Sequence, residues 1–161
     1  MKFDKVLKLG NPKLHEISSP VSKEELPSLQ NVIQELRDIL LEFRKEYGYG
    51  RAIASPQIGA MKRLVYMNIE GKETIIINPK LEKLSEETFE LWDDCLCFPN
   101  LFVRVKRHKS CTLKFTNHKW EEEIWDLEDG MSELIQHEYD HLEGILATQR
   151  AVDNKSFKMM Y

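Results

Sequence analysis

The pentapeptide His137-Glu138-Tyr139-Asp140-His141 has residue types and a spacing that could support metal chemistry. In a helix, side chains four positions apart lie on one face, so both histidines could bind a single ion. Glu138 lies next to the first histidine and could act as a general base on a water molecule. The pentapeptide therefore indicates metal-assisted hydrolysis.

The third protein ligand of such a site must be sought elsewhere in the chain. A metzincin has a histidine where this sequence has Ala147, so that class is excluded. A thermolysin-like site needs a downstream glutamate, but no Glu, His or Cys follows Glu143. Apart from Asp153, the remaining candidates lie upstream and are Cys95, Cys97, Cys111, His15, His108 and His118.

Two of the cysteines lie in residues 92–99, which we expect to connect two strands. A thiolate from Cys95 or Cys97 could complete a site with two histidines and one cysteine that leaves a position open for water. Cys111 follows the pattern of an apolar strand, so we expect it in the core. The residue types alone leave the choice between Cys95 and Cys97 open.

Several segments resemble the peptide deformylases, enzymes that remove the N-terminal formyl group from nascent polypeptides. Residues 136–144 are similar to the helical metal motif of that family. Residues 93–97 are similar to its Glu-Gly-Cys-Leu-Ser segment, and residues 50–57 to its Gly-x-Gly-Leu-Ala-Ala-x-Gln segment. With residues 9–14, which resemble the usual start, the similarity covers nearly the whole chain.

The resemblance implies a role for each matching residue. Glu138 would transfer protons, while Gln57 and the backbone N–H of Leu96 would hold the carbonyl oxygen of the substrate. The metal ligands would be Cys95, His137 and His141. The implied cofactor is one divalent metal ion, with Fe²⁺ favoured by the family, although two nitrogens and a thiolate would also hold Zn²⁺.

The resemblance also implies the substrate, N-formyl-methionyl nascent peptides. We expect Gly50, Ala52, Ile53 and Asp94 to contact the peptide. The methionine side chain would enter an apolar pocket formed in part by Ile53, Leu134 and the ring of His137. The basic run 104–109 could contact the ribosome transiently, but a solvated strand and turn is the favoured explanation of this run.

The sequence departs from the family pattern at several of these positions. Ala52 replaces a glycine, Asp93 and Asp94 replace the Glu-Gly pair, and Cys97 replaces a serine and could compete for the metal. Two alternatives therefore stay open. One is a deformylase-like metal-binding protein with altered or no deformylase activity, and the other is a small metallopeptidase.

Periodicity indicates which elements position these residues. Ser22 and Glu25 form a capping-box pattern before a long amphipathic helix that ends near residues 47–50. Short runs rich in β-branched and aromatic residues follow, and a second helix begins near residues 129–132 and ends at Gly144. The expected strands are 64–67, 74–77, 102–105, 111–115 and 123–125. We predict one α+β domain over residues 1–161, with a mostly antiparallel sheet.

Composition limits the classes of function. The chain has 161 residues, with 23 Lys and Arg against 27 Asp and Glu, so its formal net charge is −4. This balance disfavours a broad basic surface for DNA. The sequence has no apolar run long enough to span a bilayer, and three cysteines are too few for a disulfide scaffold. We therefore expect a cytoplasmic protein that binds no membrane.

Overall fold

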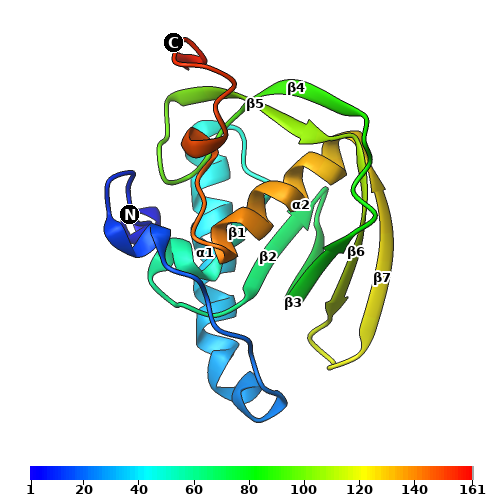
Figure 1. Cartoon of the computed structure of the whole chain (residues 1–161). Coiled ribbons are helices and arrows are strands. Elements are labelled where there is room, and N and C mark those ends of the chain that lie inside the picture. The colour runs from blue at the N-terminus through cyan, green and yellow to red at the C-terminus, as the bar shows by residue number, and fades with distance from the viewer. Residues whose placement is uncertain (161) are drawn as a thin grey trace.

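The computed structural model describes residues 1–160 and has two α-helices and eight strands in that range (Figure 1). The helices are α1 (Gln30–Tyr47) and α2 (Asp129–Leu142). The strands are β1 (Ala52–Ala54), β2 (Leu64–Ile69), β3 (Lys72–Glu82), β4 (Thr88–Asp93), β5 (Leu101–His108), β6 (Ser110–Thr116), β7 (Glu122–Glu128) and β8 (Phe157–Met159). Within residues 1–160, no helix is both long and apolar enough to cross a membrane.

The predicted first helix is present but forms in two parts. Ser22 and Glu25 make the reciprocal capping-box hydrogen bonds, at 2.8 and 3.3 Å. A 3₁₀ segment (Lys23–Leu29) follows and contains Pro27, which has no N–H to donate. Helix α1 then runs to Tyr47 and ends at Gly48, whose φ of 79° is readily adopted by glycine.

The strands form two antiparallel sheets. One has the order β1-β2-β3-β6-β7, and the other has the order β4-β5-β8. The predicted α+β class is thus confirmed, and all five predicted strands are present with longer bounds. Strands β1, β4 and β8 are not among the predicted ones. Residues 92–99 were expected to connect two strands, but the first two of them, Trp92 and Asp93, belong to β4. Exposed and half-buried residues alternate along most of this strand.

The five-stranded sheet separates the two helices, because successive side chains of a strand point to opposite faces. One set packs in a core with α1, namely Ile53, Leu64, Tyr66, Ile75 and Ile77. The other set packs in a second core with α2, namely Ala52, Ala54, Val65, Met67 and Ile76. The buried loop after β4 joins the first core, so residues 95–98 pack in the same cluster as Ile53 of β1.

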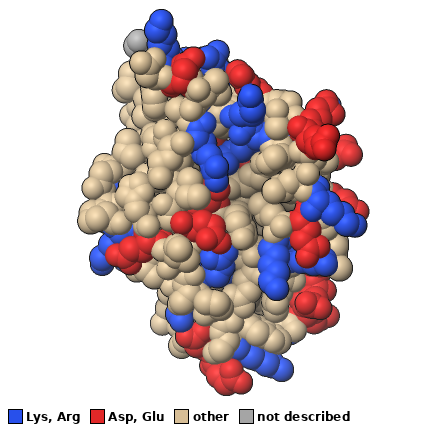
Figure 2. Space-filling view, in the orientation of Figure 1, with Lys and Arg blue, Asp and Glu red and all other residues tan. Residues whose placement is uncertain are grey.

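The molecular surface carries charges of both signs. Figure 2 shows acidic and basic side chains interspersed over the face seen in Figure 1. This mixture agrees with the small net charge of −4.

Candidate metal centre

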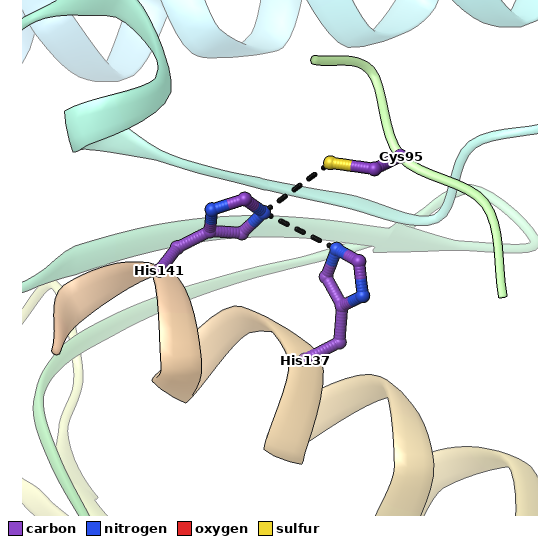
Figure 3. Close-up of side chains that lie close together, drawn as sticks. All are labelled: Cys95, His137 and His141. Atoms are coloured by element: carbon purple, nitrogen blue, oxygen red, sulfur yellow. Dashed lines mark hydrogen bonds between the residues drawn. The ribbon is translucent and has the colours of Figure 1, made fainter. Parts of the chain in front are cut away.

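Helix α2 and the loop after β4 bring three possible metal ligands together (Figure 3). Nε2 of His137 and Nε2 of His141 lie 3.2 Å apart, since the two residues are one turn apart on the same helix face. Sγ of Cys95 lies 3.4 Å from Nε2 of His141. All three ligand atoms lie within 4.8 Å of one another, and all three residues are buried.

These distances fit a bound divalent ion. With zinc–nitrogen and zinc–sulfur bonds of ordinary length, neighbouring ligand atoms of a tetrahedral site lie roughly 3.3 to 3.6 Å apart. The 3.4 Å between Sγ of Cys95 and Nε2 of His141 lies in that range, and the 3.2 Å between the two Nε2 atoms lies just below it. In addition, Oε2 of Glu138 is buried without a hydrogen-bond partner, which is expected of a group that faces a water molecule in the complete site.

The other ligand candidates lie elsewhere. The thiol of Cys111 lies in the second core, 3.6 Å from Oγ of Ser132, as expected for a core cysteine. Nδ1 of His108 lies 2.7 Å from the carbonyl oxygen of Ser85. His15 and His118 are exposed, and Cys97 is buried beside Cys95 without joining the cluster. The tertiary structure therefore favours Cys95 as the third ligand.

Asp93, at the end of β4, orients the first histidine. Its Oδ2 lies 2.8 Å from Nδ1 of His137, which leaves Nε2 directed at the cluster. Burial opposes the charged form of His137, but the nearby Asp93 carboxylate outweighs it and raises the pKa of His137 to about 9. Arg107 donates hydrogen bonds to both Asp93 and Asp140, so the Asp93 carboxylate is itself held in place. In the sequence, Asp93 stands out only as a departure from the family pattern, and no local signal indicates its contact with His137.

Glu138 is a buried acid that follows His137 on α2. Its side chain is buried, and burial disfavours the carboxylate and raises the pKa of Glu138 to about 7. A carboxyl group with a pKa near neutrality can both accept and release a proton at physiological pH. This property matches the general base expected from the sequence.

Two amide donors lie beside the cluster. Oε1 of Gln57 accepts a hydrogen bond of 2.8 Å from the backbone N–H of Ala54, which turns Nε2 toward the sulfurs. Nε2 of Gln57 lies 3.6 Å from Sγ of Cys95 and 3.4 Å from Sγ of Cys97. Among residues 1–160, no group accepts a hydrogen bond from the backbone N–H of Leu96. Gln57 therefore lies against both sulfurs, and the Leu96 N–H is left without an acceptor among the described residues.

A cleft of about 480 Å³ leads to the cluster, and several predicted substrate contacts line it. Gly50, Ala52, Asp94 and Leu134 are among its lining residues, together with His137. Ala52 has no positive φ and pairs with Met67 in the sheet, so replacing glycine here causes no strain.

The expectation that the Ile53 side chain lines this cleft was wrong. The side chain of Ile53 is fully buried in the core beside α1 and does not line the cleft, because it points to the opposite face from Ala52. The cleft has apolar and charged lining residues alike, since Leu134 lines it together with the ion pair of Arg51 and Glu133. Only the backbone of Ile53 is left to contact a peptide.

Comparisons with known proteins agree with this geometry. The family model described as polypeptide deformylase matches residues 3–157. The chain belongs to the polypeptide deformylase family. Peptide deformylase 2 of Clostridium perfringens is 32% identical over 153 residues, which is 94% of each chain. Peptide deformylase of Carboxydothermus hydrogenoformans is 32% identical over 94% of this chain and 95% of that one.

Solved structures of deformylases share the fold. The crystal structure of peptide deformylase from Thermotoga maritima has a TM-score of 0.83 and 28% identity, covering 92% of this chain and 97% of that one. Membership of the deformylase family makes the chain a metal-dependent hydrolase that acts on formylated nascent peptides. The resemblance seen in the sequence is thus confirmed.

Proposed function

We propose that Cys95, His137 and His141 hold the catalytic metal of this deformylase and that Glu138 is its general base. The observation that carries the proposal is the approach of Nε2 of His137, Nε2 of His141 and Sγ of Cys95 to within 4.8 Å of one another. Two nitrogens and one sulfur leave a coordination position free, as catalytic sites require. When bound there, a divalent ion polarises a carbonyl group and makes water more acidic.

Side chains and one backbone N–H of the protein transfer the protons and bind the carbonyl oxygen. Glu138 takes a proton from the attacking water and delivers it to the amine that leaves, so that water and the formyl amide become formate and a free N-terminus. Gln57 and the backbone N–H of Leu96 donate hydrogen bonds to the carbonyl oxygen, where negative charge develops. Each such donor contributes roughly 3 kcal/mol to lowering the barrier.

The substrate is proposed to be an N-formyl-methionyl peptide that lies along β1. That strand is at the edge of its sheet, so its outer backbone groups, apart from the Ala54 N–H that donates to Gln57, have no strand partner and can pair with a peptide. Gly50 and Ala52 line the cleft beside this edge, and Asp94 lines it from the loop after β4. The backbone of Ile53 is the fourth proposed contact.

The identity of the metal is a separate proposal. The family resemblance favours Fe²⁺, while the donor set of two imidazoles and a thiolate also suits Zn²⁺. Metal analysis of protein prepared without oxygen distinguishes the two. Iron in an active sample supports Fe²⁺ as the metal. An active sample that contains zinc but no iron contradicts Fe²⁺.

A formate-release assay tests the proposed roles. Protein loaded with Fe²⁺ under anaerobic conditions should release formate from a formyl-Met peptide. Glu138→Gln should lower kcat by about 10²- to 10⁴-fold while the metal content stays the same. Equal rates in the two proteins would contradict the role of Glu138. Digestion of casein that depends on Glu138 would instead support the small metallopeptidase.

The ribosome contact and the cytoplasmic location stay proposals. In the basic run 104–109, Arg104 pairs with Asp153, and Arg107 is buried against Asp93 and Asp140. Lys109 pairs with Glu87. Most of the run therefore serves internal ion pairs, which lends the ribosome contact little support.

A further inference from the structure

Cys97 is a buried nucleophile beside the metal centre that the proposed reaction does not use. Only 1% of it is exposed, and its sulfur lies outside the cluster of ligand atoms. The deformylase pattern has a serine at this position, and a serine cannot form a bond between two sulfurs. A thiol two residues after the proposed ligand Cys95 therefore adds a chemical property that deformylation does not need.

The sulfur atoms of Cys95 and Cys97 lie around one amide group. Nε2 of Gln57 lies 3.6 Å from Sγ of Cys95 and 3.4 Å from Sγ of Cys97. The backbone N–H of Cys97 also donates to Sγ of Cys95, over 3.5 Å. Both side chains therefore extend from the loop after β4 toward the same point in the interior.

The backbone of this loop suits a bond between the two cysteines. A disulfide usually joins Cα atoms that lie about 4.4 to 6.8 Å apart. Residues two positions apart are separated by at most about 7 Å in a fully extended chain. Residues 95–98 instead form a turn, closed by a hydrogen bond of 3.1 Å from the N–H of Phe98 to the carbonyl oxygen of Cys95. The Cα atoms of Cys95 and Cys97 are thus close enough for a disulfide without a change in the chain path.

The cleft gives a small oxidant access to this pair. Cys95 is among the residues that line the cleft of about 480 Å³. Figure 3 shows its sulfur pointing from the loop toward the imidazoles of His137 and His141. Hydrogen peroxide is only slightly larger than the water that the proposed reaction requires at this position. A hydroperoxide in the cleft can therefore meet Sγ of Cys95 first, with Cys97 directly behind it.

We propose that Cys95 and Cys97 form a reversible redox pair that gives up the metal when a hydroperoxide enters the cleft. The thiolate of Cys95 attacks hydrogen peroxide, so that an S–O bond forms, the O–O bond breaks and hydroxide leaves. Sγ of Cys97 then attacks Sγ of Cys95, so that the S–S bond forms, the S–O bond breaks and the departing oxygen takes the thiol proton of Cys97 as water. The two sulfurs lose two electrons in total, and the peroxide gains them.

The disulfide has two consequences for the metal centre. It removes one of the three proposed ligands, because the thiolate is the form of cysteine that binds a metal. It also prevents further oxidation of Cys95 to sulfinic acid, which thiol reductants do not reverse. The release of metal rests on the proposed function, since it requires Cys95 to be a ligand, whereas formation of the disulfide does not.

Peroxide treatment of the zinc-loaded full chain tests the inference, because Zn²⁺ itself undergoes no redox change. Peptide mass mapping should show a Cys95–Cys97 disulfide, and a chromogenic chelator should detect the loss of roughly one zinc ion per chain. A dithiol reductant should then restore zinc binding. In Cys97→Ser, sulfinic acid should accumulate at Cys95, and the reductant should restore about fivefold less zinc binding or lower still. Cys111→Ala, a control in the second core, should behave as the unaltered chain does.

The readouts separate this inference from the proposed function. Oxidation of Cys95 or loss of zinc while Cys97 stays a free thiol would overturn the redox pair, and so would retention of zinc and both thiols under peroxide. Equal recovery of zinc binding in Cys97→Ser and the unaltered chain would overturn the role of Cys97. A chain that never binds zinc would contradict the ligand role of Cys95, while the disulfide would still be detected by its mass. The mass map of the unaltered chain decides even when the variant folds poorly.

Discussion

Asp93 and His137 are joined by a contact of 2.8 Å between a carboxylate oxygen and Nδ1 of the imidazole. This contact connects the end of β4 to the face of α2 that carries both proposed histidine ligands. It selects the ring nitrogen that remains for the metal, since the carboxylate accepts the proton of Nδ1. A residue outside the ligand cluster therefore fixes the orientation of one proposed ligand.

Replacing Asp93 should weaken metal binding. An Asp93→Asn variant keeps the size of the side chain but removes the charge that fixes the imidazole, and we expect about 10- to 100-fold lower metal affinity. Competition with a chelator of known affinity measures the change, with Glu86→Gln as a matched surface control. Unaltered affinity in Asp93→Asn would show that the contact has no influence on the ion.

The two neighbouring cysteines should respond differently to substitution. Cys95→Ala removes the sulfur that lies 3.4 Å from Nε2 of His141, so the purified protein should lose its metal. Cys97→Ala removes a sulfur outside the ligand cluster and should retain the metal. Metal content per chain, measured on both variants, checks the assignment. The reverse pattern would mean that Cys97 is the ligand.

Arg107 should be essential for stability. It is 4% exposed and donates to Asp93 and Asp140, so its removal leaves two buried carboxylates without this partner. We expect Arg107→Met to lower the free energy of unfolding by about 3 to 5 kcal/mol. Urea denaturation measures the loss. The control is Lys114→Met, which breaks an exposed ion pair with Glu82 and should cost less than about 1 kcal/mol.

The contribution of Glu73 to stability should depend on pH. Hydrogen bonds from Arg37 and from the hydroxyl of Tyr66 lower the pKa of Glu73 in the folded state. The contribution is therefore present above the unfolded pKa of about 4.3 and is lost as the pH falls through the lower folded pKa. Urea midpoints of the unaltered chain and Glu73→Gln should differ at pH 7 and converge near pH 3. A gap that widened on acidification would contradict this linkage.

Local patterns in the sequence determined much of the fold. The capping box of Ser22 and Glu25 and the apolar periodicity after it correctly indicated the first helix. The spacing of His137 and His141 placed both on one face of α2, because helix geometry alone brings residues four positions apart together. Strand β4 was missed because its residues alternate between exposed and half-buried positions, which gives a weak hydrophobic pattern.

The residue types and their spacing alone identified the two histidines and the adjacent glutamate as candidate site residues. The family resemblance singled out Cys95 as the third candidate ligand. Only the tertiary structure decided which side chains meet across long separations in the chain. It placed Asp93 behind His137, turned Ile53 away from the cleft, and paired Arg51 with Glu133, 82 positions apart. The physical reason is that periodicity and capping act within a few residues. Contacts between elements depend instead on strand register and on how helices pack against the sheet.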